Sequence, residues 1–223
     1  MNMKLFGRAI VRFVCGVVLL GLLLFLPAGT FRWWQAWLMM GILFIPMFAA
    51  GLVMLKKSPG LLEKRLNAKE EQGEQKRVIL QSGLMFTLAF IVAGLNFRFG
   101  WIKLPNAVSW AAAGVFLAGY VLYAEVLREN TWLSRTVEVQ ENQQVVDTGL
   151  YGIVRHPMYM STLLLFMSMP LVLGSILSFV IMLAYIPIIA RRIRNEEEVL
   201  EQGLAGYSEY KKRVRYRVIP FVW

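Results

Sequence analysis

The sequence is poor in the residues that build disulfides, metal centres and soluble surfaces. Its one cysteine, Cys15, cannot form an intramolecular disulfide or a cysteine-ligated metal cluster. Its one histidine, His156, argues against a histidine-based metal centre, and no metal site is predicted. Charged residues make up 17% of the chain, against roughly 25% in soluble domains. The sequence has neither a GxGxxG motif nor a Walker-type loop, which excludes a soluble Rossmann or P-loop nucleotide domain.

Apolar residues dominate instead, at 57% of the chain, and the mean hydropathy is +0.54. They gather in five long runs, at residues 9–26, 33–55, 78–97, 104–124 and 158–190. Each of the first four runs is long enough for one helix to cross a bilayer core of about 30 Å, at about 1.5 Å per residue. The sequence therefore predicts an all-α, polytopic membrane protein with five to six transmembrane helices.

The fifth run is too long for one membrane crossing, because a single helix over 158–190 would extend about 50 Å. It contains Pro170 and, near its middle, the pair Gly174-Ser175, which favours a tight hairpin of two short helices. Basic residues support this topology, since they concentrate on the cytoplasmic side of membrane proteins. With the N-terminus inside and the hairpin returning the chain, only three of the 24 basic residues lie outside: Arg32, Arg98 and Lys103. Both termini are therefore expected in the cytoplasm, with a C-terminal helix there.

The chain divides into two parts near residue 103. Residues 1–103 are expected to form N-terminal transmembrane helices with a cytoplasmic connector, and 104–223 a second membrane unit that carries the polar motifs. The basic N-terminus followed by an apolar run is also typical of a signal peptide, but no small-x-small cleavage site follows, so a retained first helix is expected. The connector 56–77 mixes charges of both signs and predicts a short surface helix plus a turn.

One polar segment precedes the hairpin. Residues 145–156 are expected to be extended, with a turn at Thr148-Gly149. Proline suits the first turn of a helix, so Pro157 predicts that Arg155 and His156 lie at the mouth of the hairpin's first helix. Free N–H groups, the helix dipole and a guanidinium would make this a site for an anion or carboxylate. The alternative is that Arg155 is a topological anchor and His156 a helix cap.

A second polar segment follows the hairpin. On a helical wheel from Ile193, three residues lie within about 40° of one face: Leu200, Leu204 and Tyr207. Glu196 and Glu197 flank this packing face, while Glu198 points away from it. Carboxylates on a packing face are costly unless they meet a cation or hydrogen-bond donors. The candidates for that partner are Arg155, an arginine of residues 191–194, or a positively charged ligand.

The basic run 211–217 ends the second segment. It is interpreted as an interfacial patch that contacts anionic membrane lipid. Nucleic-acid binding is not expected, because this run adjoins the membrane and is followed by Phe221-Val222-Trp223.

The motifs of these two segments resemble a superfamily of integral-membrane enzymes, the isoprenylcysteine carboxyl methyltransferases and phospholipid methyltransferases. The resemblance covers roughly residues 104–220. The matching elements are Gly149-x-Tyr151-x-x-Val154-Arg155-His156-Pro157-x-Tyr159, then Glu196-Glu197-x-x-Leu200, then Tyr207-x-x-Tyr210. It implies that residues 104–223 form a methyltransferase-like membrane core with a pocket for the cofactor S-adenosylmethionine.

By carry-over from the family, two sets of residues would line this pocket. Tyr151, Arg155, His156, Pro157 and Tyr159 would form one side, and Glu196, Glu197, Tyr207 and Tyr210 the other. The chemistry agrees with this assignment: a guanidinium at a helix N-terminus suits the cofactor's carboxylate, a glutamate its ammonium or ribose, and tyrosine faces its sulfonium.

The resemblance implies a small lipidic methyl acceptor: the carboxylate of a prenylcysteine-like molecule, the amine of a phospholipid, or another isoprenoid. A carboxylate acceptor needs a cation to hold it, and Arg213 is the candidate. An amine acceptor must lose a proton, and a glutamate such as Glu197 or a tyrosine would have to accept it. The lipid tail would enter sideways between helices.

Two other functions stay open at this point. One is an NADPH-dependent membrane reductase of the sterol or steroid type, which shares the Arg-His-Pro-x-Tyr pattern; a basic pocket for the 2′-phosphate would favour it. The other is a non-enzymatic membrane scaffold, although a scaffold gives no reason for carboxylates on a packing face. The oligomeric state is not predicted. Under the methyltransferase interpretation, Glu197→Gln and Arg155→Ala are each expected to abolish cofactor binding and to leave the fold intact.

Overall fold

The computed structural model describes residues 3–66, 73–133 and 137–223, and in these ranges it is helical without any named strand. The first part of the chain contains α1 (Met3–Ala28), α2 (Trp34–Lys57), α3 (Pro59–Leu66) and α4 (Gly73–Phe99). The second part contains α5 (Asn106–Glu129), the 3₁₀ turn η1 (Gly149–Gly152), α6 (Pro157–Val172), α7 (Ile176–Met182), α8 (Tyr185–Gly203) and α9 (Tyr207–Arg213).

The predicted fold class is confirmed. Helices α1, α2, α4 and α5 coincide with the first four apolar runs, and each continues a few residues beyond the end of its run. Five helical segments in the described ranges are long and apolar enough to cross a membrane, the fifth being Ile176–Gly203. The predicted surface helix of the connector is α3; the rest of the predicted turn, at 67–72, lies outside the described residues.

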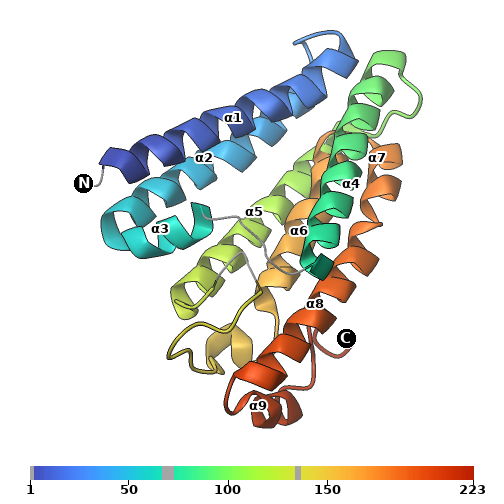
Figure 1. Cartoon of the computed structure of the whole chain (residues 1–223). Helices are drawn as coiled ribbons and strands as arrows, with labels where there is room; N and C mark the ends of the chain where they lie inside the picture. Colours follow the sequence, from blue (N-terminus) through green and yellow to red (C-terminus); the bar gives the residue numbers. More distant parts are fainter. Residues whose placement is uncertain (1–2, 67–72, 134–136) are drawn as a thin grey trace.

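The fifth run folds as the expected hairpin. Helix α6 ends at Val172, and Gly174 takes a φ of +73°, a left-handed conformation that glycine adopts without steric cost. Ser175 then caps α7, because its hydroxyl oxygen accepts a hydrogen bond from the backbone N–H of Ser178 at 3.2 Å. The chain returns through α7 and α8 to the end of the bundle where α6 began (Figure 1).

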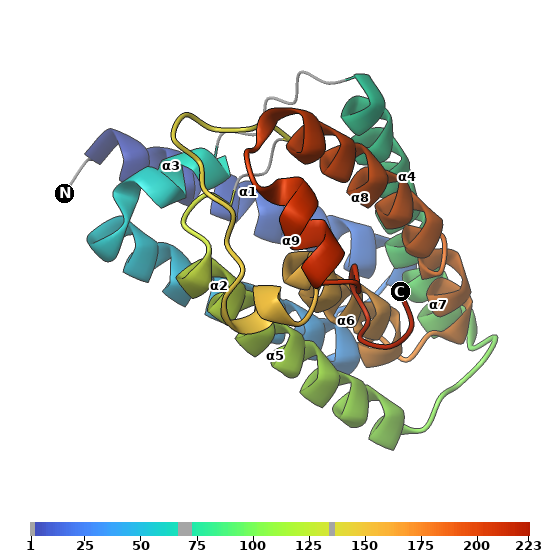
Figure 2. The same cartoon turned by 90° about the horizontal axis from the view of Figure 1, so that it is seen from below.

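Helix α6 is the central element of the second part. It packs between α5 and α7, while α4 packs on α7 and α8, and α1 contacts both α2 and α4. Figure 2, which views the bundle from below, shows α9 and the segment before α6 gathered beneath the lower ends of these helices. This end of the bundle, at the bottom of Figure 1, is where the two polar segments of the sequence meet.

The contact between α1 and α4 is close enough to require glycine at one position. A Cβ added at Gly94 would lie 2.8 Å from the carbonyl oxygen of Leu24 and 3.0 Å from the Pro27 Cβ. Gly83, on the same helix, has nothing within 4 Å of the equivalent position. Gly94 is therefore packed tightly against α1, whereas Gly83, on the same helix, has open space beside it.

We expect Gly94→Ala to lower stability by about 1–3 kcal/mol, because the methyl group must push α1 away from α4. Gly83→Ala is the matched control and should leave stability unchanged or raise it by up to about 1 kcal/mol through helix propensity. Thermal unfolding of both variants in the same detergent measures the difference. Equal melting temperatures for the two variants would contradict the close α1–α4 contact.

Candidate functional site

The segment that precedes α6 is attached to the end of α5. Gly149 has a φ of +51°, and any Cβ there would overlap the carboxylate of Glu129. This carboxylate accepts a hydrogen bond from the backbone N–H of Leu150 at 3.0 Å. The predicted turn at Thr148-Gly149 is thus the start of η1, and its glycine is required both by backbone conformation and by space.

Tyr151, in η1, connects three parts of the chain. Its hydroxyl accepts a hydrogen bond from Asn130 Nδ2 at 2.9 Å, next to the end of α5. Its carbonyl oxygen accepts one from the Tyr210 hydroxyl of α9 at 2.8 Å. Two of the predicted site residues, 59 sequence positions apart, are therefore joined directly.

The residues at the start of α6 pair with the end of the chain. Residues 214–223, which we call the C-terminal strap, run beside the segment before α6 and form a parallel bridge between Val154 and Tyr216. The backbone N–H groups of Arg155 and His156 donate to the carbonyl oxygens of Tyr216 and Arg217, at 2.9 and 2.8 Å. Helix α6 then begins at Pro157, as predicted.

Glu197 of α8 is the centre of a buried ion cluster. Its side chain is almost fully buried, and its Oε1 accepts a hydrogen bond from Arg155 Nε at 2.8 Å and lies 3.3 Å from His156 Nε2. Its Oε2 accepts one from Arg217 Nε at 3.0 Å and lies 3.9 Å from Lys211 Nζ. Two guanidinium groups keep this carboxylate ionised, so the expected cation on the packing face of α8 comes from within the protein.

Arg155 is also occupied on its other side. Its Nη1 donates to the carbonyl oxygens of Val214 and Arg215 at 2.7 and 2.8 Å, and the residue is 7% exposed. Arg155 thus holds the C-terminal strap against α8. The distribution of glutamates along α8 follows the helical wheel: Glu197 is buried, Glu196 is half-buried, and Glu198 is exposed.

A second chain of polar contacts involves the other glutamate. The Tyr159 hydroxyl, on α6, accepts a hydrogen bond from Arg192 Nε at 2.9 Å and donates a short one to Glu196 Oε2. Tyr159 is 3% exposed, so this contact between α6 and α8 is shielded from solvent. Glu196 and Glu197, adjacent in sequence, therefore have different partners and different surroundings.

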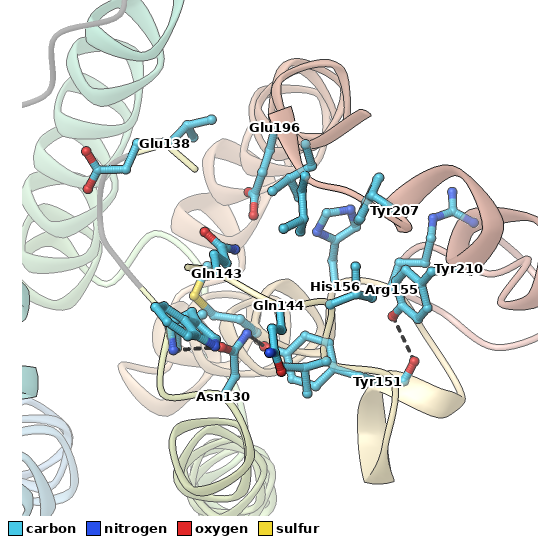
Figure 3. A pocket seen from close by; sticks show the side chains of 18 of the residues that line it. Asn130, Glu138, Gln143, Gln144, Tyr151, Arg155, His156, Glu196, Tyr207 and Tyr210 are labelled. Atoms are coloured by element: carbon cyan, nitrogen blue, oxygen red, sulfur yellow. Dashed lines mark hydrogen bonds between the residues drawn. The ribbon is translucent and has the colours of Figure 1, made fainter. Parts of the chain in front are cut away.

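These groups surround a cavity, with about 840 Å³ of empty space that is open in part to solvent (Figure 3). Of the predicted site residues, seven line it: Tyr151, Arg155, His156, Tyr159, Glu196, Tyr207 and Tyr210. Pro157 and Glu197 lie beside it without lining it. Arg213 does not line it either; its side chain is exposed and paired with Asp147.

The structure adds lining residues that the motifs did not indicate. Most come from the segment between α5 and η1: Asn130, Trp132, Leu133, Val137, Glu138, Gln143, Gln144, Val145 and Val146. Others are Met158 on α6 and Arg192 and Leu204 on or beside α8, and Leu200, which the glutamate motif included, lines the cavity as well. The concentration of polar residues in 125–160 indicated this region, but no spacing rule distinguishes a lining glutamine from a solvated one.

Tyr207 of α9 lines the cavity and carries a buried polar atom that makes no hydrogen bond to the described residues. It is 4% exposed, and its hydroxyl has no hydrogen-bond partner within the described ranges 3–66, 73–133 and 137–223. Burial, and the nearby carboxylates of Glu197 and Glu196, raise the pKa of the Tyr207 phenol well above its ordinary value. Tyr207 therefore stays protonated, as a hydrogen-bond donor that has no acceptor among the described residues.

Comparison with known proteins finds a family that this part of the chain resembles. Residues 107–205 match the family model described as phospholipid methyltransferase. The matched range contains η1, the start of α6 and the paired glutamates of α8. The resemblance to the integral-membrane methyltransferases that the motifs predicted is confirmed.

A similar curated protein is the Delta(14)-sterol reductase of Mus musculus, which is 32% identical over 91 residues. The alignment covers 40% of this chain, and the chain spans only 22% of the length of that relative.

The ion cluster leads to a test of stability on α8. Glu197→Gln removes the anion from three buried or half-buried cationic partners and should cost about 3–5 kcal/mol, the usual effect of breaking a buried ion pair. This differs from the expectation based on sequence, in which the fold stayed intact. Glu198→Gln changes the neighbouring exposed carboxylate and should alter stability by less than about 0.5 kcal/mol.

The measurement is thermal unfolding of purified wild-type protein and both variants in one detergent. A wild-type melting temperature for Glu197→Gln would show that the ion cluster does not hold together α8, the segment before α6 and the C-terminal strap.

Proposed function

We propose that the protein is an integral-membrane methyltransferase that uses S-adenosylmethionine to methylate a small lipidic acceptor. The match of residues 107–205 to the phospholipid methyltransferase family carries this proposal, because it includes most of the cavity walls. The segments that line the cavity lie at the lower end of the helix bundle in Figure 1, where an acceptor with a polar head and an apolar tail would have its head at the membrane surface.

The residues of the cavity fit the methyl donor. S-adenosylmethionine, when bound, supplies an activated methyl group on a sulfonium, and it also carries a carboxylate, an ammonium and ribose hydroxyls. The buried and unpaired Tyr207 hydroxyl is a donor suited to the carboxylate or a ribose oxygen. Glu196, which lines the cavity, suits the ammonium or ribose hydroxyls, and the tyrosine faces suit the positive charge of the sulfonium.

The protein's own contribution would be alignment in a shielded site. Methyl transfer is an in-line displacement, so the residues of the cavity mainly have to orient the acceptor and keep water away. Arg155 and Glu197 would act by fixing the α6 mouth and the strap, since their charged groups already pair with each other. The carboxylate-binding role of Arg213 would need this exposed side chain to leave Asp147.

An NADPH-dependent reductase is the second candidate, favoured by the similarity to a sterol reductase. Such an enzyme needs a cation for the cofactor's 2′-phosphate. Two arginines line the cavity, Arg155 and Arg192, and both are engaged, the first with Glu197 and the second with the Tyr159 hydroxyl. This arrangement favours the methyltransferase.

We further propose that the cavity opens to the cytoplasm, with both termini on that side. Exposed basic side chains lie at the same end of the bundle as the cavity: Lys212, Arg213 and Arg215. Cytoplasmic loops of membrane proteins carry this excess of lysine and arginine, and the patch would contact anionic membrane lipids.

Ligand-dependent stability distinguishes the two enzymatic candidates. A ligand that binds only the folded state stabilises it by about 2.7 kcal/mol at a hundredfold excess over its dissociation constant. We expect the melting temperature of the detergent-solubilised protein to rise with S-adenosylhomocysteine and to stay unchanged with NADPH. A rise with NADPH alone would make the protein a reductase.

Tyr207 provides a sharper test of the binding site. Tyr207→Phe removes a buried hydroxyl that lacks a partner, so the ligand-free protein should keep or gain stability, by up to about 1–3 kcal/mol. The same change should weaken S-adenosylhomocysteine binding about 5- to 15-fold, the effect of one hydrogen bond of about 1–1.5 kcal/mol. Opposite signs for stability and affinity are expected only if the hydroxyl serves a ligand.

Tyr210→Phe is the matched control on the same helix. Its hydroxyl already donates to the Tyr151 carbonyl oxygen, so its loss should lower the melting temperature of the ligand-free protein. Calorimetric titration with S-adenosylhomocysteine gives the affinities. Unchanged affinity in Tyr207→Phe would remove Tyr207 from the proposed site.

A further inference from the structure

His156, the one histidine of the chain, lies in the wall of the expected cofactor pocket, but no group of the cofactor has been assigned to it. Its ring lines the cavity and is 5% exposed, among the side chains shown in Figure 3. Its backbone N–H is paired with the carbonyl oxygen of Arg217, which fixes the residue at the mouth of α6. The imidazole is thus held in place within the space where an acceptor must meet the methyl donor.

The contact with Glu197 sets the tautomer of this ring. Nε2 of His156 lies 3.3 Å from Glu197 Oε1. An ionised carboxylate can only accept hydrogen bonds, so Nε2 must carry the hydrogen. In the neutral imidazole, the lone pair is then on Nδ1. Within the described part of the chain, Nδ1 has no hydrogen-bond partner.

Several cations share the carboxylate that His156 contacts. Glu197 is shared with Arg155 and Arg217, at 2.8 and 3.0 Å, and Lys211 lies 3.9 Å from the same carboxylate. One anion therefore faces three cations before any charge on His156 is counted. From α6, the neutral phenol of Tyr159 packs beside the imidazole, with ring centroids 5.7 Å apart.

The remaining charged and titratable groups of the cavity wall lie on α8 and α9 and on the segment between α5 and α6, which brings Glu138 and Tyr151 to the wall. Glu196 is bound by the Tyr159 hydroxyl, which also accepts a hydrogen bond from Arg192, and Tyr207 of α9 keeps its proton. Glu197 is already held by its cations and Glu196 by Tyr159. Among the residues that the structure describes, the Nδ1 lone pair of His156 is therefore a basic atom on the cavity wall that makes no hydrogen bond.

We propose that His156 is the general base of the reaction, with Glu197 as its positioning residue, and that the acceptor is a nucleophile that bears a proton at neutral pH. This inference rests on the proposed methyltransferase function. The acceptor class is then an ammonium, thiol or hydroxyl group on a lipidic molecule, and a carboxylate, which is already deprotonated, is excluded.

The proton and electron balance of the step is simple. The acceptor's nitrogen, sulfur or oxygen gives its proton to Nδ1 of His156 and keeps the electron pair of the broken bond. That pair forms the bond to the transferred methyl carbon, while the electron pair of the broken methyl–sulfur bond stays on sulfur. The proton on His156 then passes to water, which restores the neutral ring.

Because the chain has a single histidine, its ring can be observed directly. In protein labelled with ¹⁵N-histidine, we expect one pair of imidazole nitrogen signals, with Nε2 protonated and Nδ1 unprotonated at pH 8. A spectrum in which Nδ1 carries the hydrogen would overturn the proposal, whatever the activity. The pH at which these signals titrate also gives the protonation midpoint of His156 without reference to turnover.

The pH dependence of activity must then have the same midpoint as the protonation of His156. With tritiated S-adenosylmethionine and mixed micelles of phosphatidylethanolamine, an ammonium acceptor, kcat/KM should fall about tenfold per pH unit below the midpoint measured by NMR. His156→Gln should reduce turnover by about 10²-fold or more, the usual contribution of a general base. It should still bind S-adenosylhomocysteine, which shows that the variant is folded.

Glu198→Gln is the control for the second polar segment and should keep wild-type turnover. The proposal is overturned if His156→Gln retains more than a tenth of the wild-type rate, or if the wild-type enzyme methylates only N-acetyl-S-farnesylcysteine, a carboxylate acceptor. In both cases S-adenosylhomocysteine would still bind, and the methyltransferase function would stand. Absence of that binding in the wild-type protein would instead overturn the proposed function itself.

Discussion

The buried carboxylate of Glu197 is the interaction on which the cavity end of this protein depends. Three segments that are separate in the sequence meet there: α8, the mouth of α6 and the C-terminal strap. Each brings a charge that would be costly to bury alone, and each is compensated by the others. The cavity wall is therefore a consequence of one ion cluster, which holds Arg155 and His156 at fixed distances from α8.

The membrane explains why this polar chemistry lies at one end. In a bilayer core, backbone groups must be satisfied within helices, so irregular segments are confined to places where the chain leaves the membrane. Helix α6 begins at Pro157 and the hairpin returns through α8, which brings both polar segments to the same surface. Residues 130–133 and 137–156, which include η1, and the strap supply the irregular backbone that a cavity needs, outside the apolar runs.

Much of the site could be predicted from residue patterns, and the limits of that prediction have identifiable causes. The wheel for α8 distinguished buried Glu197 from exposed Glu198, because a packing face repeats every 3.6 residues. It could not show that Glu197 pairs with cations of the protein while Glu196 turns to Tyr159 and the cavity. Adjacent residues on one helix have different environments whenever two other elements pack there.

The sequence by itself determined the membrane class, the hairpin and the two motif segments, because these follow from apolar length, glycine and proline placement, and helical periodicity. Only the tertiary structure decided which charged and polar side chains pair with each other and which remain available to a ligand. Arg155 and Glu197 are 42 positions apart, and Arg155 reaches Val214 59 positions away. Such pairings depend on how helices pack in space, and local sequence patterns carry no information on those distances. That is why the free hydroxyl of Tyr207 and the oriented ring of His156 became visible only in the folded chain.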